Sequence, residues 1–152
     1  MEILEYVNTY KDNVNEFVHK IFVDEFGYQE FSNAILSSEN EEYFMESNKL
    51  WIAIENEEII GTIGIIEVSE KCAMLKKVYV KEEYRGKGIA QNLLNQCLAY
   101  AREKNYDYIF LQTYHRLERA RAFYSKNGFI EYEDGYQKTH YNEIRYRLDL
   151  KT

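Results

Sequence analysis

The chain has 152 residues and a formal net charge of −7, with 45% hydrophobic and 16% aromatic residues. This composition is sufficient for the packed core of one domain over residues 1–152, and it excludes intrinsic disorder. The negative charge argues against nucleic-acid binding, which needs a basic face, and no apolar run is as long as a membrane span.

The chain is predicted to begin with a strand over Glu2–Val7. Apolar residues then recur at three- and four-residue spacing, which predicts a helix from about Thr9 to Phe26. Thr9 and Asp12 resemble a capping box at its start, and Gly27 is expected to end it. A shorter helix and a polar, acidic loop are expected to follow.

Three short strands separated by tight turns predict an antiparallel meander over Leu50–Ile54, Ile59–Val68 and Cys72–Val80. Behind them, apolar residues stepping by four from Ile89 to Ala101 predict an amphipathic helix. The next strand, Tyr108–Thr113, completes a strand–helix–strand unit, which implies a parallel crossover.

The last part of the chain is predicted to hold one helix and two strands. The helix covers Arg116–Lys126 and is stopped by Gly128. The segments Phe129–Glu133 and Glu143–Leu150 alternate like a terminal strand pair. The fold class is therefore α+β, with a mixed, mostly antiparallel sheet of about seven strands flanked by helices.

Charge is uneven along the chain: residues 1–70 hold 3 Lys or Arg and 16 Asp or Glu, whereas residues 71–152 hold 16 and 10. The basic half suits an anionic ligand and the acidic half a cationic one, unless the charges merely neutralise each other within one domain. Cys72 and Cys97 fit no disulfide or CxxC pattern, and the histidines are scattered, so no metal site is predicted.

A glycine-rich segment, Arg85-Gly86-Lys87-Gly88, lies between a predicted strand and a predicted helix. The first amides of a helix lack intrahelical acceptors and carry partial positive charge, and glycines allow close approach of a ligand. A phosphate or pyrophosphate site is one interpretation. The spacing matches neither a Walker A loop nor a dinucleotide fingerprint, which would need glycine or alanine where Gln91 stands. An ordinary glycine-rich helix start remains the alternative on these residues alone.

Two segments resemble the GCN5-related N-acetyltransferase (GNAT) superfamily. The first is similar to its acyl-CoA-binding motif and comprises Leu75–Val80, Tyr84–Ala90, Leu93 and Leu94. The second is similar to its later NxxAxxxYxxxGF segment and comprises Ala120, Phe123, Tyr124, Gly128 and Phe129. The resemblance implies the family's fold, acetyl-CoA as co-substrate and transfer of an acetyl group to an amine.

The resemblance also implies roles for individual residues. Main-chain amides that hold the CoA pyrophosphate correspond to Arg85, Gly86, Lys87, Gly88, Ile89 and Ala90. The strand that pairs with the pantetheine arm corresponds to Val78, Tyr79 and Val80, with the Val80 N–H as donor to the thioester oxygen. Tyr124 corresponds to the tyrosine that protonates the departing sulfur. Leu117 stands where the family often has an asparagine that touches the arm, so this contact is lost or replaced by His115 or Arg116.

An amine must lose a proton before it attacks, because an aliphatic amine is mostly protonated at neutral pH. Glu67 is the first prediction for the base and His115 the second; a solvated strand-end carboxylate and a helix N-cap are their structural alternatives. The family's acceptor position implies an aromatic lining that suits a cationic small molecule or a lysine side chain, formed by Tyr28, Phe31, Tyr136 and Tyr141.

The leading hypothesis is therefore a cytoplasmic, acetyl-CoA-dependent N-acetyltransferase without a metal, which could form a homodimer because family members often pair through strands. The start of the sequence lacks the basic and apolar regions of a signal peptide, which fits the expected location. Two alternatives stay open. One is a non-catalytic CoA-binding sensor or interaction module on the same fold, and the other is a nucleotide-phosphate binder that uses Gly86–Gly88.

Overall fold

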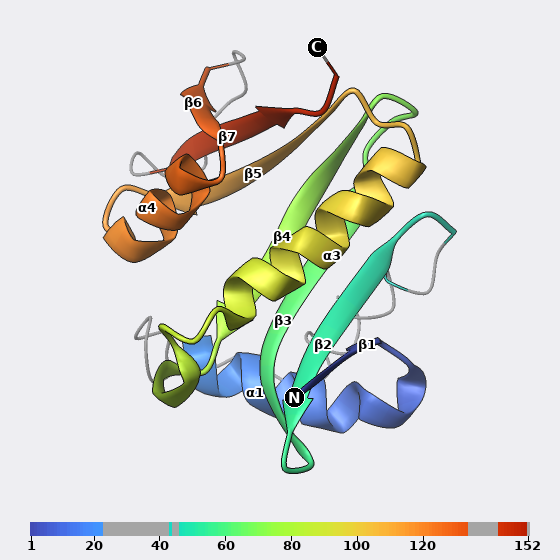
Figure 1. The fold of residues 1–152 in the computed structure, drawn as a ribbon, viewed down its shortest axis with the longest axis vertical. Coiled ribbons are helices and arrows are strands. Elements are labelled where there is room, and N and C mark those ends of the chain that lie inside the picture. Colours follow the sequence, from blue (N-terminus) through green and yellow to red (C-terminus); the bar gives the residue numbers. More distant parts are fainter. Residues whose placement is uncertain (23–42, 44–45, 134–142, 152) are drawn as a thin grey trace. The chain divides into compact units, whose positions relative to one another are not determined.

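The computed structural model describes residues 1–22, 43, 46–133 and 143–151 of the chain (Figure 1). Its elements in chain order are β1 (Glu2–Glu5), the 3₁₀ helix η1 (Asn8–Tyr10), α1 (Lys11–Lys20), β2 (Lys49–Glu55), β3 (Glu58–Glu67), β4 (Cys72–Val80), the 3₁₀ helix η4 (Glu82–Tyr84), α3 (Ile89–Glu103), β5 (Tyr108–Tyr114), α4 (Glu118–Lys126), β6 (Ile130–Tyr132) and β7 (Glu143–Asp149).

The strands form one seven-stranded sheet in the order β1-β2-β3-β4-β5-β7-β6. β4 and β5 pair in parallel, from Cys72 opposite Tyr108 to Met74 opposite Phe110, as the predicted crossover through α3 requires. The pairs β1–β2, β2–β3, β5–β7 and β6–β7 are antiparallel. The predicted α+β class with a mixed, mostly antiparallel sheet is confirmed.

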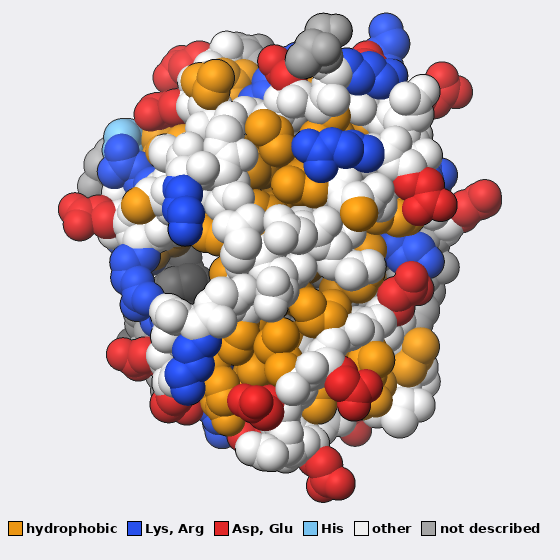
Figure 2. All heavy atoms as spheres, in the orientation of Figure 1, with side chains coloured by type: hydrophobic (Ala, Val, Ile, Leu, Met, Phe, Trp, Pro, Cys, Tyr) orange, Lys and Arg blue, Asp and Glu red, His pale blue; other side chains and the backbone are white. Residues whose placement is uncertain are grey.

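The chain divides into two compact units, and each is described by itself. The first unit comprises Met1–Ile66 and Lys76–Tyr100, and the second comprises Glu67–Leu75 and Ala101–Thr152. The chain passes between the units within β3, within β4 and again within α3. The face drawn in Figure 2 carries both acidic and basic side chains.

The first unit is built around β2 and β3, which pack against a helix on each face. Leu50 and Ile52 of β2 are buried in a cluster with Val14, Phe17 and other apolar residues of α1. Trp51, between them in sequence, meets the ring of Tyr100 in α3 at 5.6 Å. Consecutive residues of β2 therefore contact different helices, as the alternation of side chains along a strand requires.

Close approach between β3 and its neighbours is possible because glycines stand at two positions of that strand. A Cβ on Gly61 would lie 3.0 Å from Leu93 Cδ1 in α3, and one on Gly64 would lie 2.7 Å from the Tyr43 ring. The second unit has its own core. It includes the fully buried Ile109 and the nearly buried Leu111 and Phe129.

Several boundaries differ from expectation. α1 begins at Lys11 after η1, and no side chain caps either helix, so the predicted capping box of Thr9 and Asp12 is wrong. α4 begins at Glu118, two residues later than predicted, because Leu117 occupies its N-cap position. The predicted end of the first helix at Gly27 and the shorter helix after it lie outside the described residues. Among the described residues, no helix is long and apolar enough to cross a membrane.

Candidate functional site

The glycine-rich segment starts from an anchored turn at the end of β4. The Tyr84 N–H donates to the Lys81 carbonyl at 2.9 Å, and the Arg85 N–H donates to the Glu82 carbonyl at 3.2 Å. The Arg85 side chain turns back, and its Nε donates to the Val80 carbonyl at 3.0 Å. This bond ties the start of the loop to the last residue of β4, so the guanidinium serves to shape the loop.

Both glycines of the loop adopt left-handed backbone conformations. The φ angles of Gly86 and Gly88 are +79° and +83°, and a Cβ built at either position would have no heavy atom within 4 Å. Glycine is therefore required by the backbone conformation and not by lack of space. The predicted glycine-rich turn between strand and helix is present.

The main-chain N–H groups of residues 86–90 lie where the loop enters α3. Within the part of the chain that the structure describes, none of these N–H groups donates to a protein acceptor. The Asn92 N–H makes a helical bond to the Gly88 carbonyl at 3.0 Å. Lys87 adds a positive charge, with its Nζ 5.3 Å from the centre of the Tyr84 ring. Such a set of unbonded N–H groups at a helix start can bind an anionic phosphate or diphosphate.

β4 contains a backbone kink just before the strand residues predicted to hold the pantetheine arm. Lys77 has a φ of +53°, an unusual value for a residue with a side chain. Its carbonyl accepts a 2.6 Å hydrogen bond from the hydroxyl of Thr62, which is fully buried in β3. The kink departs from the regular strand pattern immediately before Val78. Sequence reasoning missed it, because lysine has no preference for positive φ and no pattern links Thr62 to Lys77.

The neighbouring strand residues are packed within the first unit. The ring of Tyr79 meets Phe22 edge-on at 5.7 Å, and Val80 is 9% exposed. These three residues, Val78–Val80, and the loop 85–90 all belong to the first unit. The structure thus brings the predicted phosphate loop and the predicted pantetheine strand together in one compact body.

Tyr124 of α4 lies in the aromatic core of the second unit. Its ring centre is 5.7 Å from those of Phe123 and Phe129 and 6.1 Å from that of Tyr146. The side chain is only 6% exposed, and burial raises the pKa of its hydroxyl far above the usual value. Among the described residues, the hydroxyl has no hydrogen-bond partner. Tyr124 is therefore a neutral O–H donor at ordinary pH.

The residues before α4 have mainly structural contacts. Leu117 is half-buried, and its main-chain N–H donates to the Tyr114 carbonyl at 3.0 Å. His115 is exposed, and its carbonyl accepts a 3.1 Å hydrogen bond from the Arg121 guanidinium. The alternative that His115 caps the helix is wrong, because Leu117 holds that position.

Glu67, the predicted base, ends β3 and lies in the second unit. Its Oε1 accepts a 2.7 Å hydrogen bond from the hydroxyl of Tyr106, a residue that is 1% exposed. The carboxylate therefore provides the hydrogen-bond acceptor for the hydroxyl of a buried tyrosine. The two residues are 39 positions apart, so no local sequence signal indicates the contact.

The predicted acceptor lining, Tyr28, Phe31, Tyr136 and Tyr141, lies outside the described residues. Over residues 1–22, 43, 46–133 and 143–151, no three His, Cys, Asp or Glu side chains are grouped to hold a metal ion.

Comparison with known proteins gives consistent matches. Residues 15–129 match the acetyltransferase (GNAT) family. The chain is 35% identical over 82 residues to an uncharacterised N-acetyltransferase of Dictyostelium discoideum, which covers 53% of this chain and 38% of that protein. It is 33% identical over 84 residues to human N-acetyltransferase 8B, which covers 52% of this chain and 37% of that protein. The chain thus spans less than half the length of either relative.

Two solved structures extend the likeness over the whole chain. An acetyltransferase of the GNAT family from Staphylococcus aureus is 31% identical with a TM-score of 0.87, covering 99% of both chains. An aminoglycoside 6′-N-acetyltransferase complexed with coenzyme A is 17% identical with a TM-score of 0.76, covering 98% of this chain and 97% of the other. At that identity the second structure supports the fold alone.

Proposed function

The chain belongs to the acetyltransferase (GNAT) family, and from this premise we propose that it transfers an acetyl group from acetyl-CoA to a primary amine. The observation that carries the proposal is the set of main-chain N–H groups at residues 86–90, which have no acceptor within the described protein. CoA is proposed as the carrier because the aminoglycoside 6′-N-acetyltransferase of the same fold is complexed with coenzyme A.

The diphosphate of CoA is assigned to the loop Arg85–Ala90, and the pantetheine arm to the main chain of Val78–Val80. The two sites are joined by the hydrogen bond from Arg85 to the Val80 carbonyl, which fixes the loop relative to the strand end. Binding by main-chain groups tolerates the loss of a side-chain contact at Leu117, which has no polar side-chain group to offer the arm.

The reaction begins when the amine nitrogen attacks the thioester carbonyl and forms a tetrahedral oxyanion. A main-chain N–H at Val80 is assigned to stabilise this oxyanion, and one such donor typically contributes about 3–4 kcal/mol. The C–S bond then breaks, and the amide and the CoA thiolate separate. Tyr124 is assigned to give its proton to that thiolate. Burial raises the pKa of Tyr124, so the hydroxyl is protonated when the thiolate leaves, and the phenolate formed by the transfer takes a proton back from solvent.

A base must also take a proton from the amine, because only about one aliphatic amine in a few thousand is neutral at pH 7. Glu67 is assigned this role. The assignment follows from its place at the end of β3, the strand that precedes β4. If the contact between Glu67 and Tyr106 has only a structural role, replacing Glu67 should lower stability and leave kcat unchanged. Mutation therefore separates the catalytic role from the structural one.

The acceptor is assigned to the class of cationic amines, either a small molecule or a lysine side chain. The support is the excess of Asp and Glu in residues 1–70 and the aromatic residues that the sequence places at the expected acceptor site, Tyr28, Phe31, Tyr136 and Tyr141.

Two observations favour a second candidate, a CoA-binding module without catalysis. Leu117 caps α4 where the family often has an asparagine, and the carboxylate of Glu67 already has a partner. Such a module would bind CoA through the loop and would release no CoA from acetyl-CoA with any acceptor.

The test is an assay of CoA thiol release from acetyl-CoA with a panel of cationic, neutral and anionic amines. Release that depends on a cationic amine is the expected result. Release with anionic or neutral acceptors alone would contradict the proposed acceptor class, and no release above the amine-free rate would favour the non-catalytic module.

Glu67→Gln is compared with Tyr106→Phe, which removes the partner but keeps the carboxylate. If Glu67 is the base, Glu67→Gln is expected to lower kcat by about 100-fold. Tyr106→Phe is expected to leave kcat within a few-fold of the wild-type value. Equal losses of stability in both variants with an unchanged kcat would assign Glu67 a structural role only.

A further inference from the structure

The kink of β4 at Lys77 is held by a side chain of β3. The φ of Lys77 is +53°, and such a conformation of a residue with a side chain persists only where its surroundings hold it. The hydroxyl of Thr62 donates a 2.6 Å hydrogen bond to the Lys77 carbonyl. Thr62 is fully buried and Lys77 is 8% exposed, so water does not readily replace the hydroxyl as a donor.

The kink also shifts the alternation of side chains along β4. From Ala73 to Lys77 every second residue is buried, but the next buried residue is Val80 and not Tyr79. A shift by one residue is the effect of a β-bulge, which inserts one extra residue into a strand. The bulge therefore stands immediately before Val78–Val80, the segment whose main chain is assigned to the pantetheine arm.

The Thr62 bond determines the direction of one main-chain N–H group in this segment. The peptide unit that joins Lys77 to Val78 is planar and trans, so its carbonyl and its N–H point in opposite directions. The carbonyl is directed toward the Thr62 hydroxyl, and the Val78 N–H is therefore directed away from Thr62. The hydroxyl thus fixes the orientation of the first N–H group of Val78–Val80.

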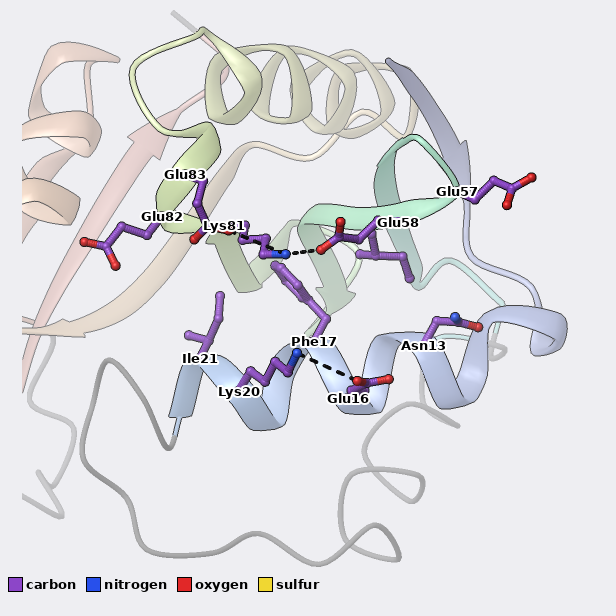
Figure 3. Close-up of a pocket in the computed structure, with 11 residues that line it drawn as sticks. Asn13, Glu16, Phe17, Lys20, Ile21, Glu57, Glu58, Lys81, Glu82 and Glu83 are labelled. Carbon is purple, nitrogen blue, oxygen red and sulfur yellow. Dashed lines mark hydrogen bonds and ion pairs between the residues drawn. The ribbon is translucent and has the colours of Figure 1, made fainter.

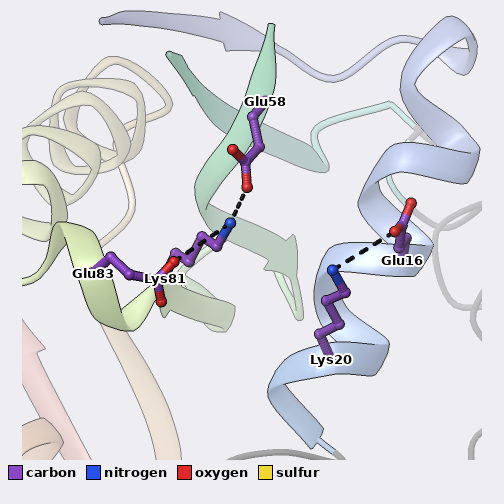
Figure 4. Close-up of polar contacts among 5 residues, drawn as sticks. All are labelled: Glu16, Lys20, Glu58, Lys81 and Glu83. Atoms are coloured by element: carbon purple, nitrogen blue, oxygen red, sulfur yellow. Dashed lines mark hydrogen bonds and ion pairs between the residues drawn. The ribbon is translucent and has the colours of Figure 1, made fainter. Parts of the chain in front are cut away.

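The other end of the segment is joined to β3 by Lys81. Its main-chain N–H donates to the Ile60 carbonyl at 2.8 Å, and its Nζ pairs with Glu58 and, at 3.5 Å, with Glu83 (Figure 4). Lys81 and Glu58 border a cavity of about 240 Å³ beside α1 (Figure 3), and their side chains are 29% and 49% exposed, so solvent weakens this ion pair. Of the two side-chain contacts, the buried one at Thr62 is expected to control the segment more strongly.

We propose that Thr62 is a positioning residue for the acyl-CoA arm: its hydroxyl holds the Lys77 carbonyl and thereby keeps the Val78 N–H in the direction in which it meets the pantetheine. The inference rests on the proposed function, which assigns the arm to Val78–Val80. Without the hydroxyl, the peptide unit can relax in the unliganded chain and must be reoriented when the arm binds. The loss therefore appears in the affinity for the arm and not in the affinity for the diphosphate.

The test compares two ligands by calorimetric titration of the full chain: CoA, and 3′-phosphoadenosine 5′-diphosphate, which is CoA without its pantetheine arm. Thr62→Val removes the hydroxyl and keeps a similar shape. It is expected to raise the Kd for CoA about threefold to tenfold, the range that one hydrogen bond of ordinary strength allows. The Kd for 3′-phosphoadenosine 5′-diphosphate should stay within about twofold, and Thr62→Ser, which keeps a hydroxyl, should leave both Kd values within about twofold.

Two control variants separate positioning from a general loosening of β3. Ile63→Val removes one methyl group from the fully buried neighbour of Thr62 and should lower the unfolding midpoint without touching the hydroxyl bond. Glu58→Gln removes the ion pair at the other end of the segment. Both should leave the ratio of the two Kd values within about twofold of the wild-type ratio.

The role of Thr62 would be overturned if Thr62→Val raised both Kd values equally or left the Kd for CoA unchanged, or if Thr62→Ser weakened CoA binding as much as Thr62→Val. A measurement on the unaltered chain adds a check: the ¹⁵N amide signal of Val78 should move with CoA and stay in place with 3′-phosphoadenosine 5′-diphosphate. Equal movement with both ligands, or none with CoA, would also overturn the proposal. A wild-type chain that binds neither ligand would instead contradict the proposed function, and this inference with it.

Discussion

Replacing Gly88 with alanine is expected to weaken CoA binding through the backbone alone. Gly88 has a φ of +83°, and an added Cβ would meet no heavy atom within 4 Å. The penalty is therefore the left-handed conformation of an L-residue, about 1–2 kcal/mol. The N–H groups of residues 86–90 have no acceptors within the described protein, so the unliganded loop can relax to a less strained conformation.

The relaxed loop must return to the left-handed conformation when CoA binds, so the penalty appears in affinity. A loss of 1–2 kcal/mol corresponds to a Kd for CoA that is about fivefold to thirtyfold higher. The midpoint of thermal unfolding without ligand should change little. Calorimetric titration with CoA and thermal unfolding of the same samples measure the two quantities.

Gly128→Ala is the matched control, because Gly128 has a φ of +90° and its added Cβ would lie 3.4 Å from Leu148 Cδ1. The Gly128 N–H donates to the Ser125 carbonyl at 3.1 Å at the end of α4, so this glycine is held in place without ligand. Here the same penalty should lower the unfolding midpoint by about 2–8 °C and leave the Kd for CoA within twofold. If the two variants weakened CoA binding equally, the reasoning would be refuted.

Three further predictions concern single side chains. Tyr124→Phe should lower kcat for CoA release at least about tenfold and leave the Kd for CoA unchanged, and an unchanged kcat would remove Tyr124 from the mechanism. Because burial raises the pKa of Tyr124, its ionisation should not limit the wild-type rate below about pH 10. Gly64→Ala places a Cβ 2.7 Å from the Tyr43 ring and should lower the free energy of unfolding in urea by about 1–3 kcal/mol, whereas an unchanged midpoint would disprove this contact. Cys97 is fully buried, and burial raises the pKa of its thiol, so it should react with a thiol reagent only after denaturation; rapid labelling of Cys97 in the native protein would contradict its burial.

Sequence patterns predicted the elements well where hydrophobic periodicity is strong. β4 was expected over Cys72–Val80 and has those bounds, because its alternation is clear and turns flank it. The predicted start of α1 was wrong, because a capping box requires a hydrogen bond that Thr9 does not make. A 3₁₀ turn precedes the helix instead. Periodicity reports which face is buried, but a helix end depends on a few local bonds.

The candidate site was also predictable only in part from the sequence. The loop 85–90 was predictable, because glycines and a helix start lie next to each other in sequence. The kink at Lys77 and its bond from Thr62 were not, since no residue type at either position indicates positive φ. The contact of Glu67 with Tyr106 also escaped prediction, because it joins elements that are distant in sequence.

The most direct test of the central claim is a titration of the ¹⁵N-labelled chain with CoA, followed by the amide signals of Gly86, Lys87, Gly88, Ile89 and Ala90. If these N–H groups hold the diphosphate, their signals should move most in the spectrum, and Gly88→Ala should require more CoA to reach the same shift. Signals that stay in place at saturating CoA, or that move no more than amides elsewhere in the chain, would contradict the account.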